Sequence, residues 1–298
     1  MMTPGIRLLW RRWRRQRTTV FGLGLLASVV AYVLIGSCLF SEIDANQTDT
    51  RLRLQPPTVT HPFGTDVVGR DVLARAIYGG QISLLIGIAA VGVSLLVGVP
   101  VGALSGYCGG VVDSLLMRGT EAVLTIPPLF LLIVAAKFLG DTLPPVPLGG
   151  RLLSGSVGVI ILVIGLTSWP ALARLVRAQF LTLREREFVL AARSIGASNR
   201  RIIMRHLLPN SVAPILVNAT LGVANAMLSE AYVSFLGLGV RQPTATWGNM
   251  LEEAPRYLAQ APWLWCFPGG LMLLTVLALH AIGDGLRDVY AAQTPAAR

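Results

Sequence analysis

Lysine is almost absent from this chain, and charged residues in general are scarce. Of 25 basic residues only Lys137 is a lysine, and 13% of the 298 residues are charged. Hydrophobic residues make up 53% of the sequence, which is not the composition of an ordinary water-soluble domain. A net charge of +10 can indicate nucleic-acid binding, but the arginines lie mainly beside long apolar runs, where membrane orientation explains them better. The composition therefore predicts a membrane protein with no nucleic-acid partner.

Cysteine pairs and catalytic motifs are also lacking. The three cysteines, Cys38, Cys108 and Cys266, lie far apart and show neither a disulfide framework nor metal-ligand spacing. The sequence contains no G-x-x-x-x-G-K-[ST], so the chain has no ATP-binding loop of the usual kind. It contains no G-x-S-x-G or H-E-x-x-H either, and no recognisable nucleophile and base for an intramembrane hydrolase. We predict no catalytic residue, no metal site and no cofactor.

Six apolar runs are long enough to cross about 30 Å of hydrocarbon as helices. They are predicted at residues 20–40, 82–104, 115–139, 157–178, 212–236 and 265–282. The first run follows an arginine-rich stretch, as an uncleaved membrane anchor does. The predicted fold class is therefore all-α, a polytopic membrane protein with six transmembrane helices.

Glycine and proline mark two of these spans. Small residues let membrane helices approach closely, so the second span is predicted to pack inside the bundle through Gly87, Gly92, Gly98 and Gly102. Pro127-Pro128 interrupts the third span and predicts a kink there.

A few polar residues lie in or beside the spans. Glu230 is placed in the fifth span, where a carboxylate costs about 2.5–3.5 kcal/mol on insertion scales. It must face protein, water or an interface, and a structural role is favoured over direct contact with a solute. Arg118 and Glu121 are three residues apart and can pair on one helical face. His280 near a helix end is expected to be satisfied locally.

Two polar segments are predicted to lie outside the membrane on the external side. Within residues 41–75, the string from His61 to Asp71 reads HPFGTDVVGRD and combines a histidine with two aspartates. These side chains suit a metal or acid–base site, but a folded loop with glycine turns and an aspartate helix cap is favoured. The second segment, residues 237–262, is flanked by Trp247 and Trp263, which we interpret as interfacial aromatics.

The segment from Glu187 to Asn210 is an arginine-rich stretch between two apolar spans. Its composition predicts a short helix, a turn at Gly196 and a second short helix that stops at Leu208-Pro209-Asn210. The positive-inside rule predicts a cytoplasmic location for this loop and for both termini. The arginines that indicate this are Arg174, Arg177, Arg184, Arg186, Arg193, Arg200, Arg201 and Arg205.

This segment resembles the coupling segment of binding-protein-dependent ABC importer permeases. The general pattern of that family is EAA, three residues, G, nine residues, I-x-L-P. Ala191, Ala192, Gly196 and Leu208-Pro209 match it, whereas Leu190 and His206 stand where the pattern has Glu and Ile. Both departures match the dipeptide/oligopeptide/nickel branch, whose acidic residue corresponds to Glu187 here. The strings at 61–71 and at 283–288, GDGLRD, are also similar to that branch.

The resemblance implies a type I ABC importer permease fold and a non-catalytic permease subunit of the C type. Its expected partners are a homologous second permease, two cytoplasmic ATPase subunits, an extracytoplasmic solute-binding protein and the lipid bilayer, which would be the bacterial inner membrane. Di- or oligopeptides are the expected solutes, with nickel or another small solute as the alternative. A self-contained channel or carrier is the rival function, but it calls for charged residues in several spans.

The predicted organisation follows from the spans and the resemblance together. It comprises a cytoplasmic basic tail at 1–19, the first helix at 20–40, an external loop at 41–75, a permease core at 76–290 and a cytoplasmic tail at 291–298. The core contains five helices and a coupling loop at about 183–209. The residues expected to couple to the ATPases are Glu187, Ala191, Ala192, Gly196, Ala197, Leu208 and Pro209.

Overall fold

The computed structural model describes residues 16–140, 142, 144–148 and 151–291. All but the first residue of the predicted tail at 291–298, and most of the basic tail at 1–19, lie outside these residues.

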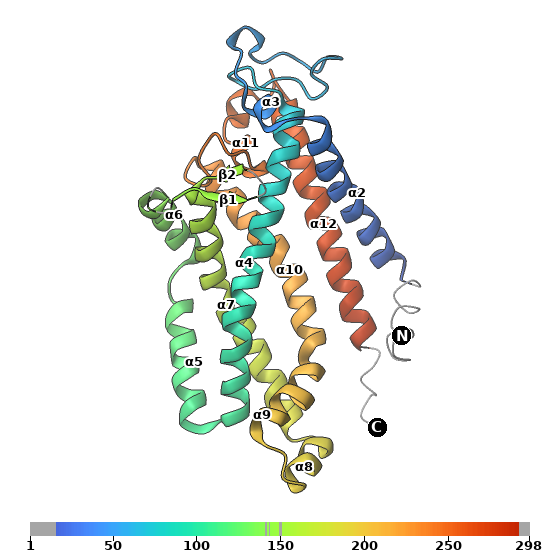
Figure 1. Ribbon diagram of the computed structural model, residues 1–298, viewed down its shortest axis with the longest axis vertical. Helices are drawn as coiled ribbons and strands as arrows, with labels where there is room; N and C mark the ends of the chain where they lie inside the picture. The colour runs from blue at the N-terminus through green and yellow to red at the C-terminus, as the bar shows by residue number, and fades with distance from the viewer. Residues whose placement is uncertain (1–15, 141, 143, 149–150, 292–298) are drawn as a thin grey trace.

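Long apolar helices lie side by side and form most of the molecule (Figure 1). They are α2 (Arg17–Leu39), α4 (Val72–Cys108), α7 (Gly155–Arg184), α10 (Leu208–Phe235) and α12 (Trp263–Ala291). Five helical segments of the described chain are long and apolar enough to cross a membrane, with α10 counted together with the short helices before it as Asn199–Phe235. The bent pair α5 (Gly110–Leu124) and α6 (Pro128–Leu139) is the sixth if it counts as one span. The predicted all-α, multi-span fold is confirmed.

The break between α5 and α6 is the kink that Pro127-Pro128 predicted. The two helices meet at 71°. Pro127 is extended, with φ −61° and ψ 118°, as the residue before a proline tends to be, and Pro128 opens the next helix where its missing N–H costs nothing.

Short elements occupy the two ends of the bundle. One end carries α8 (Glu187–Ser194), α9 (Asn199–Ile202) and the π-helical turn η2 (Ile203–Leu207), which together we call the tip. The other end carries what we call the cap, residues 40–71 and 236–262. The cap contains α3 (Glu42–Asn46), η1 (Thr50–Leu52), α11 (Trp247–Met250) and η3 (Ala254–Tyr257). A small hairpin of β1 (Val146–Leu148) and β2 (Arg151–Leu153) precedes α7.

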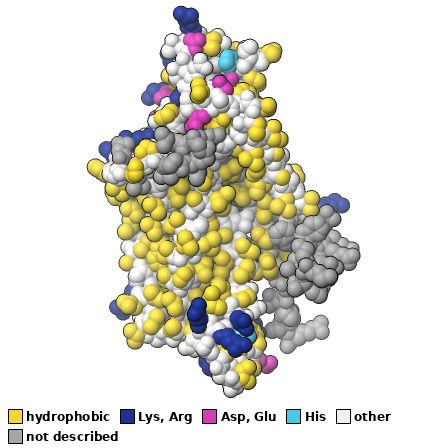
Figure 2. All heavy atoms as spheres, viewed as in Figure 1, with side chains coloured by type: hydrophobic (Ala, Val, Ile, Leu, Met, Phe, Trp, Pro, Cys, Tyr) yellow, Lys and Arg dark blue, Asp and Glu magenta, His cyan; other side chains and the backbone are white. Residues whose placement is uncertain are grey.

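Side-chain chemistry follows this division along the long axis. Figure 2 shows apolar side chains covering the middle of the visible face, basic side chains near the tip, and charges of both signs at the cap. The first turn of α2 and the last turn of α12 lie toward the same end as the tip (Figure 1). An apolar girdle with polar ends is the arrangement that a bilayer requires.

Glycines bring α4 and α7 into close contact. A Cβ atom added to Gly98 would lie 2.9 Å from the carbonyl oxygen of Trp169, and one added to Gly106 would lie 2.7 Å from that of Arg177. Gly102, between them, faces Ala173 just as closely. The close packing predicted for this helix is confirmed for Gly98 and Gly102.

The other two glycines of the predicted set differ from each other. Gly87 packs against Met227 of α10 rather than against α7. Gly92 has open space within 4 Å, so the prediction is wrong for that residue. Spacing alone does not tell which neighbour, if any, a glycine faces.

The helix does not stop at Leu208-Pro209-Asn210, so this prediction is wrong. The π-helical turn η2 runs directly into α10, and Pro209 lies in the first turn of α10. Proline removes an N–H donor, and a π-turn is a common way for a helix to absorb such a local irregularity. The Asn210 side chain donates to the backbone oxygen of His206 at 2.6 Å, and Ser211 donates to that of Leu207 at 3.0 Å. Both side chains support a continuous helix instead of capping a new one.

Trp247 of the cap and Trp263 at the start of α12 are buried, so their interpretation as interfacial aromatics is wrong. Trp247 is fully buried, and its indole N–H donates to the backbone oxygen of Ala76 at 2.8 Å. Trp263 donates to that of Thr65 at 3.0 Å. A buried tryptophan needs one acceptor for its N–H, and here both indoles find it in the backbone of an adjoining segment.

Candidate functional site

The turn of the tip is built around Gly196. Gly196 has φ +81°, a conformation that glycine adopts without steric cost. The N–H of Gly196 donates to Arg193 and the N–H of Ala197 donates to Ala192, both at 3.0 Å, which together form a Schellman motif closing α8. The predicted glycine turn is confirmed.

One face of the tip packs on the bundle. Val189 and Ala192 of α8 are buried, and Val189 joins Ile202 and Leu207 in an apolar cluster with Phe180 of α7. Ala197 packs half-buried against the same cluster. Two hydrogen bonds tie this end of the molecule together, Tyr107 Oη to Asn199 Oδ1 at 2.7 Å and Arg184 Nη1 to the oxygen of Gly106 at 3.3 Å.

The opposite face of the tip leaves apolar side chains uncovered. Phe188, Leu190 and Ile195 are exposed, Ile195 by 86%, and no atom of the described residues lies within 4 Å of where a Gly196 side chain would begin. The predicted coupling residues Glu187 and Ala191 are exposed as well, as is Pro209 in the first turn of α10, whereas Leu208 is half-buried. Exposed apolar residues gathered on one surface are typical of a site that contacts another protein or the membrane.

An ion pair fixes α5 to α7 near the tip. Asp113 accepts hydrogen bonds from Nε and Nη2 of Arg177, both at 2.6 Å, and it also contacts Ser105. Such a two-pronged contact between arginine and carboxylate combines charge with fixed geometry. The predicted partners Arg118 and Glu121 are both exposed and form no ion pair among the described residues. The predicted pair joins neighbours on one helix, whereas the observed ion pair joins two helices and was not predicted.

A second feature is a cavity of about 330 Å³ enclosed by α4, α7 and α10 within the apolar part of the bundle. Its lining contains uncharged polar side chains among small apolar ones. Those polar residues are Ser94, Thr167, Ser168, Asn218 and Asn225. We call this cavity the groove.

Two asparagines of the groove present carboxamide groups without a hydrogen-bond partner among the described residues. Thr167 and Ser168 donate back to their own helix, to the oxygens of Val163 and Ile164 at 2.8 and 2.6 Å. The carboxamides of Asn218 and Asn225 form no hydrogen bond within the described part of the chain. An unpaired amide costs several kcal/mol in hydrocarbon, so both groups require water, a partner or a solute. Their spacing of seven residues on α10 was the signal in the sequence that the two side chains share a face.

The cap confirms the folded-loop interpretation of residues 61–71. His61 Nδ1 lies 2.7 Å from Asp71 Oδ2, and the other oxygen of Asp71 caps α4 by accepting from the N–H of Ala74 at 2.8 Å. Gly64 and Gly69 take φ of +71° and +81° in the turns. Asp66 binds Arg70 Nε at 2.6 Å.

Glu230 has the structural setting that was favoured for it. It is fully buried, and its Oε1 accepts hydrogen bonds from Ser234 at 2.6 Å and from Thr246 at 2.8 Å. The carboxylate thereby joins α10 to the segment before α11. His280 is likewise satisfied locally, with Nδ1 2.9 Å from the oxygen of Val276.

A bundle of long apolar helices with polar ends is the architecture of a multi-pass membrane protein. The chain belongs to the family of binding-protein-dependent transport system inner membrane components, whose sequence pattern matches residues 98–293.

Three relatives extend the comparison to nearly the whole chain. It is 43% identical over 281 residues to a Brucella suis protein named as a peptide permease, covering 94% of this chain and 88% of that one. It is 37% identical over 279 residues to the dipeptide transport system permease protein DppC of Alkalihalophilus pseudofirmus, covering 94% and 87%. It is also 37% identical over 288 residues to the oligopeptide transport system permease protein OppC of Haemophilus influenzae, covering 95% and 88%. The resemblance identified in the sequence is confirmed.

The fold has a counterpart of known structure. A chain of the MetNI methionine ABC transporter, solved in an inward-facing conformation, superposes with a TM-score of 0.55 at 18% identity. The match covers 72% of this chain and 96% of that one. The chain therefore has the fold of an ABC importer permease.

Proposed function

We propose that this chain is the permease subunit of an ATP-driven importer of di- or oligopeptides in the bacterial inner membrane. The observation that carries the proposal is its identity of 37–43% to permeases named for peptides, over 94–95% of its length. In this proposal the chain itself does not hydrolyse ATP. Two ATPase subunits, a homologous permease and an external binding protein supply the remaining functions.

The chemistry of the groove supports a peptide rather than a metal ion as the solute. The groove is lined by hydroxyl and carboxamide groups and by small apolar residues, with no His, Cys, Asp or Glu among them. Carboxamides donate and accept hydrogen bonds, which suits the amide backbone that all peptides share. Nickel prefers imidazole and similar nitrogen ligands. We therefore assign the groove to this subunit's half of the solute path.

The tip supplies the surface through which ATP hydrolysis would act. Its exposed residues Phe188, Leu190 and Ile195 offer apolar contacts, and the arginines around them offer charge. The buried face of α8 packs on α7, and the π-turn passes without interruption into α10. A push on the tip is thus transmitted to two helices that line the groove, as in a rigid-body switch.

A paired substitution tests the coupling surface. Ile195→Ser removes an exposed apolar side chain at the tip, and Val59→Ser removes a fully exposed one at the cap. Because neither residue packs in the chain, both variants should fold and insert like the parent. Ile195→Ser should reduce binding of the ATPase subunits by about tenfold, the effect of losing about 1.4 kcal/mol, while Val59→Ser leaves it unchanged. Equal binding by both variants and the parent would remove the tip from the ATPase interface.

Orientation rests on the arginines and has its own test. A reporter that is active only outside the cytoplasm should work when fused after Asp49 or Met250 of the cap and fail after Asn199 of the tip. Activity at Asn199 would place the tip outside, where no ATPase can reach it.

The solute is tested through ATP hydrolysis by the complete assembly. Binding protein loaded with a peptide should stimulate hydrolysis, and an excess of nickel should neither replace the peptide nor compete with it. Stimulation by nickel with none by peptides would assign the chain to the alternative solute.

A further inference from the structure

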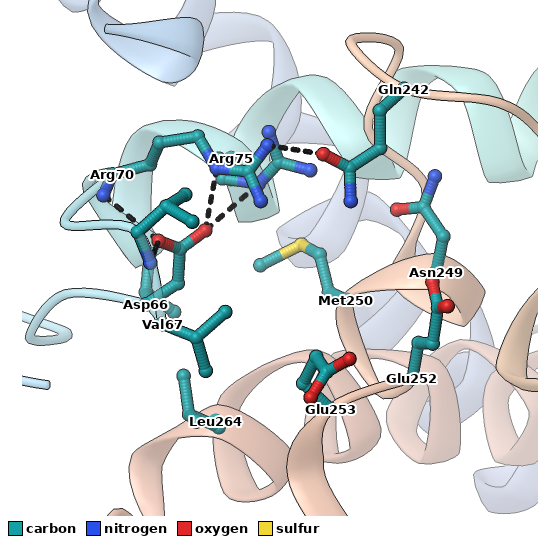
Figure 3. A pocket seen from close by; sticks show the side chains of 12 residues that line it. Asp66, Val67, Arg70, Arg75, Gln242, Asn249, Met250, Glu252, Glu253 and Leu264 are labelled. Atoms are coloured by element: carbon teal, nitrogen blue, oxygen red, sulfur yellow. Dashed lines mark hydrogen bonds and ion pairs between the residues drawn. The ribbon is translucent and has the colours of Figure 1, made fainter. Parts of the chain in front are cut away.

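The cap contains a cavity of about 240 Å³ that is separate from the groove (Figure 3). It lies between the turn before α4, the segment around α11 and the start of α12. Basic side chains line one side of it, acidic side chains line a second and apolar side chains line a third. We call these three sides the walls of the cavity.

The basic wall holds two guanidinium groups and one carboxylate. Asp66 Oδ2 lies 2.6 Å from Arg70 Nε and 3.9 Å from Arg75 Nε, and the side chains of Arg70 and Arg75 are only 10% and 3% exposed. Within the described residues, the remaining hydrogen bonds of these two side chains go to neutral oxygens, including Gln242 Oε1 at 2.6 Å from Arg70 Nη1. The wall therefore has one positive charge in excess. A buried charge without a counter-charge is costly, so the wall favours an anionic group in the cavity.

The acidic wall faces the cavity from the segment after α11. Glu253 is held by Arg256, with Oε2 3.1 Å from Nη1. Glu252 forms no ion pair within the described residues. Burial and then the nearby charge of Glu253 raise the pKa of its carboxyl above the usual value, and the charge of Arg256 opposes this rise. A cationic group in the cavity would supply the missing partner of Glu252.

The space between the charged walls is apolar and small. Val67, Met250 and Leu264 line it, and Figure 3 shows Met250 between the guanidinium groups and the two glutamates, with Val67 and Leu264 to one side. Its volume of about 240 Å³ lies below the roughly 300–1,000 Å³ of pockets for drug-sized ligands, so the cavity suits a short peptide rather than a long one.

We propose that this cavity binds the zwitterion of a short peptide, with the carboxylate at Arg70 and Arg75, the ammonium at Glu252 and a side chain against Met250. A ligand whose only charged group is a carboxylate would contact the basic wall alone, whereas a dipeptide contacts all three walls. The inference rests on the proposed function, since it takes peptides as the solutes. It adds a peptide site on the cap, outside the membrane groove.

The test uses the assembled permeases and ATPases in lipid nanodiscs, without binding protein. Binding of alanyl-leucine is compared with that of its C-terminal amide and its N-acetyl derivative by saturation-transfer NMR titration. Each derivative lacks one of the two charges, so each should bind about tenfold to a hundredfold more weakly, the range for a lost charge-assisted hydrogen bond.

Matched variants locate the site. Glu252→Gln should weaken binding of alanyl-leucine about tenfold and leave binding of the N-acetyl derivative unchanged. Glu253→Gln is the control, because Glu253 already has Arg256 as its partner, and it should have little effect. Arg70→Gln should remove the preference for the free acid over the amide. If that variant destabilises the cap, the two glutamate variants still decide the question.

Three results would overturn the inference: no binding of alanyl-leucine at millimolar concentration, equal binding of all three ligands, or equal effects of the two glutamate substitutions. Uptake by the complete assembly separates this inference from the proposed function. If peptides are still imported in any of these cases, only the cap site is lost. If no peptide is imported at all, the proposed function fails.

Discussion

The close contact between α4 and α7 leads to a quantitative prediction, which a pair of substitutions in α4 can test. Gly106→Ala would place a Cβ atom 2.7 Å from the oxygen of Arg177 and 2.7 Å from Cβ of Phe180. Both neighbours are held by helix α7 and cannot rotate away, and overpacking of this kind costs about 1–3 kcal/mol. Gly92→Ala, on the same helix, would meet nothing within 4 Å. Alanine is favoured over glycine in a helix by about 1 kcal/mol at both positions, and this common gain cancels when the variants are compared.

The expected difference is therefore about 1–3 kcal/mol in unfolding free energy, with Gly106→Ala the less stable variant. The assay is unfolding of both purified variants in the same detergent, followed by circular dichroism. Gly92→Ala should equal or exceed the parent in stability. Equal stability of the two variants would refute the close approach of the helices at Gly106.

Two further predictions concern the cap. Trp247→Phe removes the hydrogen bond to the oxygen of Ala76 and should lower the unfolding free energy by about 1–3 kcal/mol, while Trp265→Phe, at an exposed residue, should change it little in the same assay. The backbone N–H of Ser41 and then its side chain hold the pKa of the Asp44 carboxyl below its usual value of 3.8. The stabilisation of α3 by Asp44 is therefore present above pH 3.8 and lost as the pH falls through the lowered pKa. Hydrogen exchange of the segment should show this loss in the parent, and an equal loss in Asp44→Asn would contradict it.

The membrane spans and the glycine turn could be predicted from the sequence alone. Long apolar runs can only be buried as helices in a bilayer, and Gly196 lies where helical residues on both sides require a turn. The cap loop was predictable for a related reason, because Gly64, Gly69 and Asp71 each have a strong local preference.

Features that depend on neighbours distant in the chain were not predictable. Trp247 is buried because α4 supplies an acceptor 171 residues away, and no local pattern encodes that contact. Asp113 prefers Arg177, on another helix, over any neighbour on its own. The continuous helix through Pro209 required a π-turn, whose energetics depend on packing rather than on composition.

The candidate site was predicted in part for the same reason. The coupling residues lie together at the tip, but the exposure of Phe188, Leu190 and Ile195 became visible only in the fold. The groove joins residues of three helices and was not predicted, although the seven-residue spacing of Asn218 and Asn225 was a signal for it in the sequence.

Peptide uptake into proteoliposomes tests the central claim most directly. The chain would be reconstituted with its sister permease, both ATPase subunits and the binding protein, and then by itself. We expect ATP-dependent accumulation of a labelled dipeptide only with the complete set, and neither ATP hydrolysis nor solute movement by the isolated chain. Solute or ion flux through the isolated chain would instead make it a channel or carrier, and would contradict its assignment as one subunit of an ATP-driven importer.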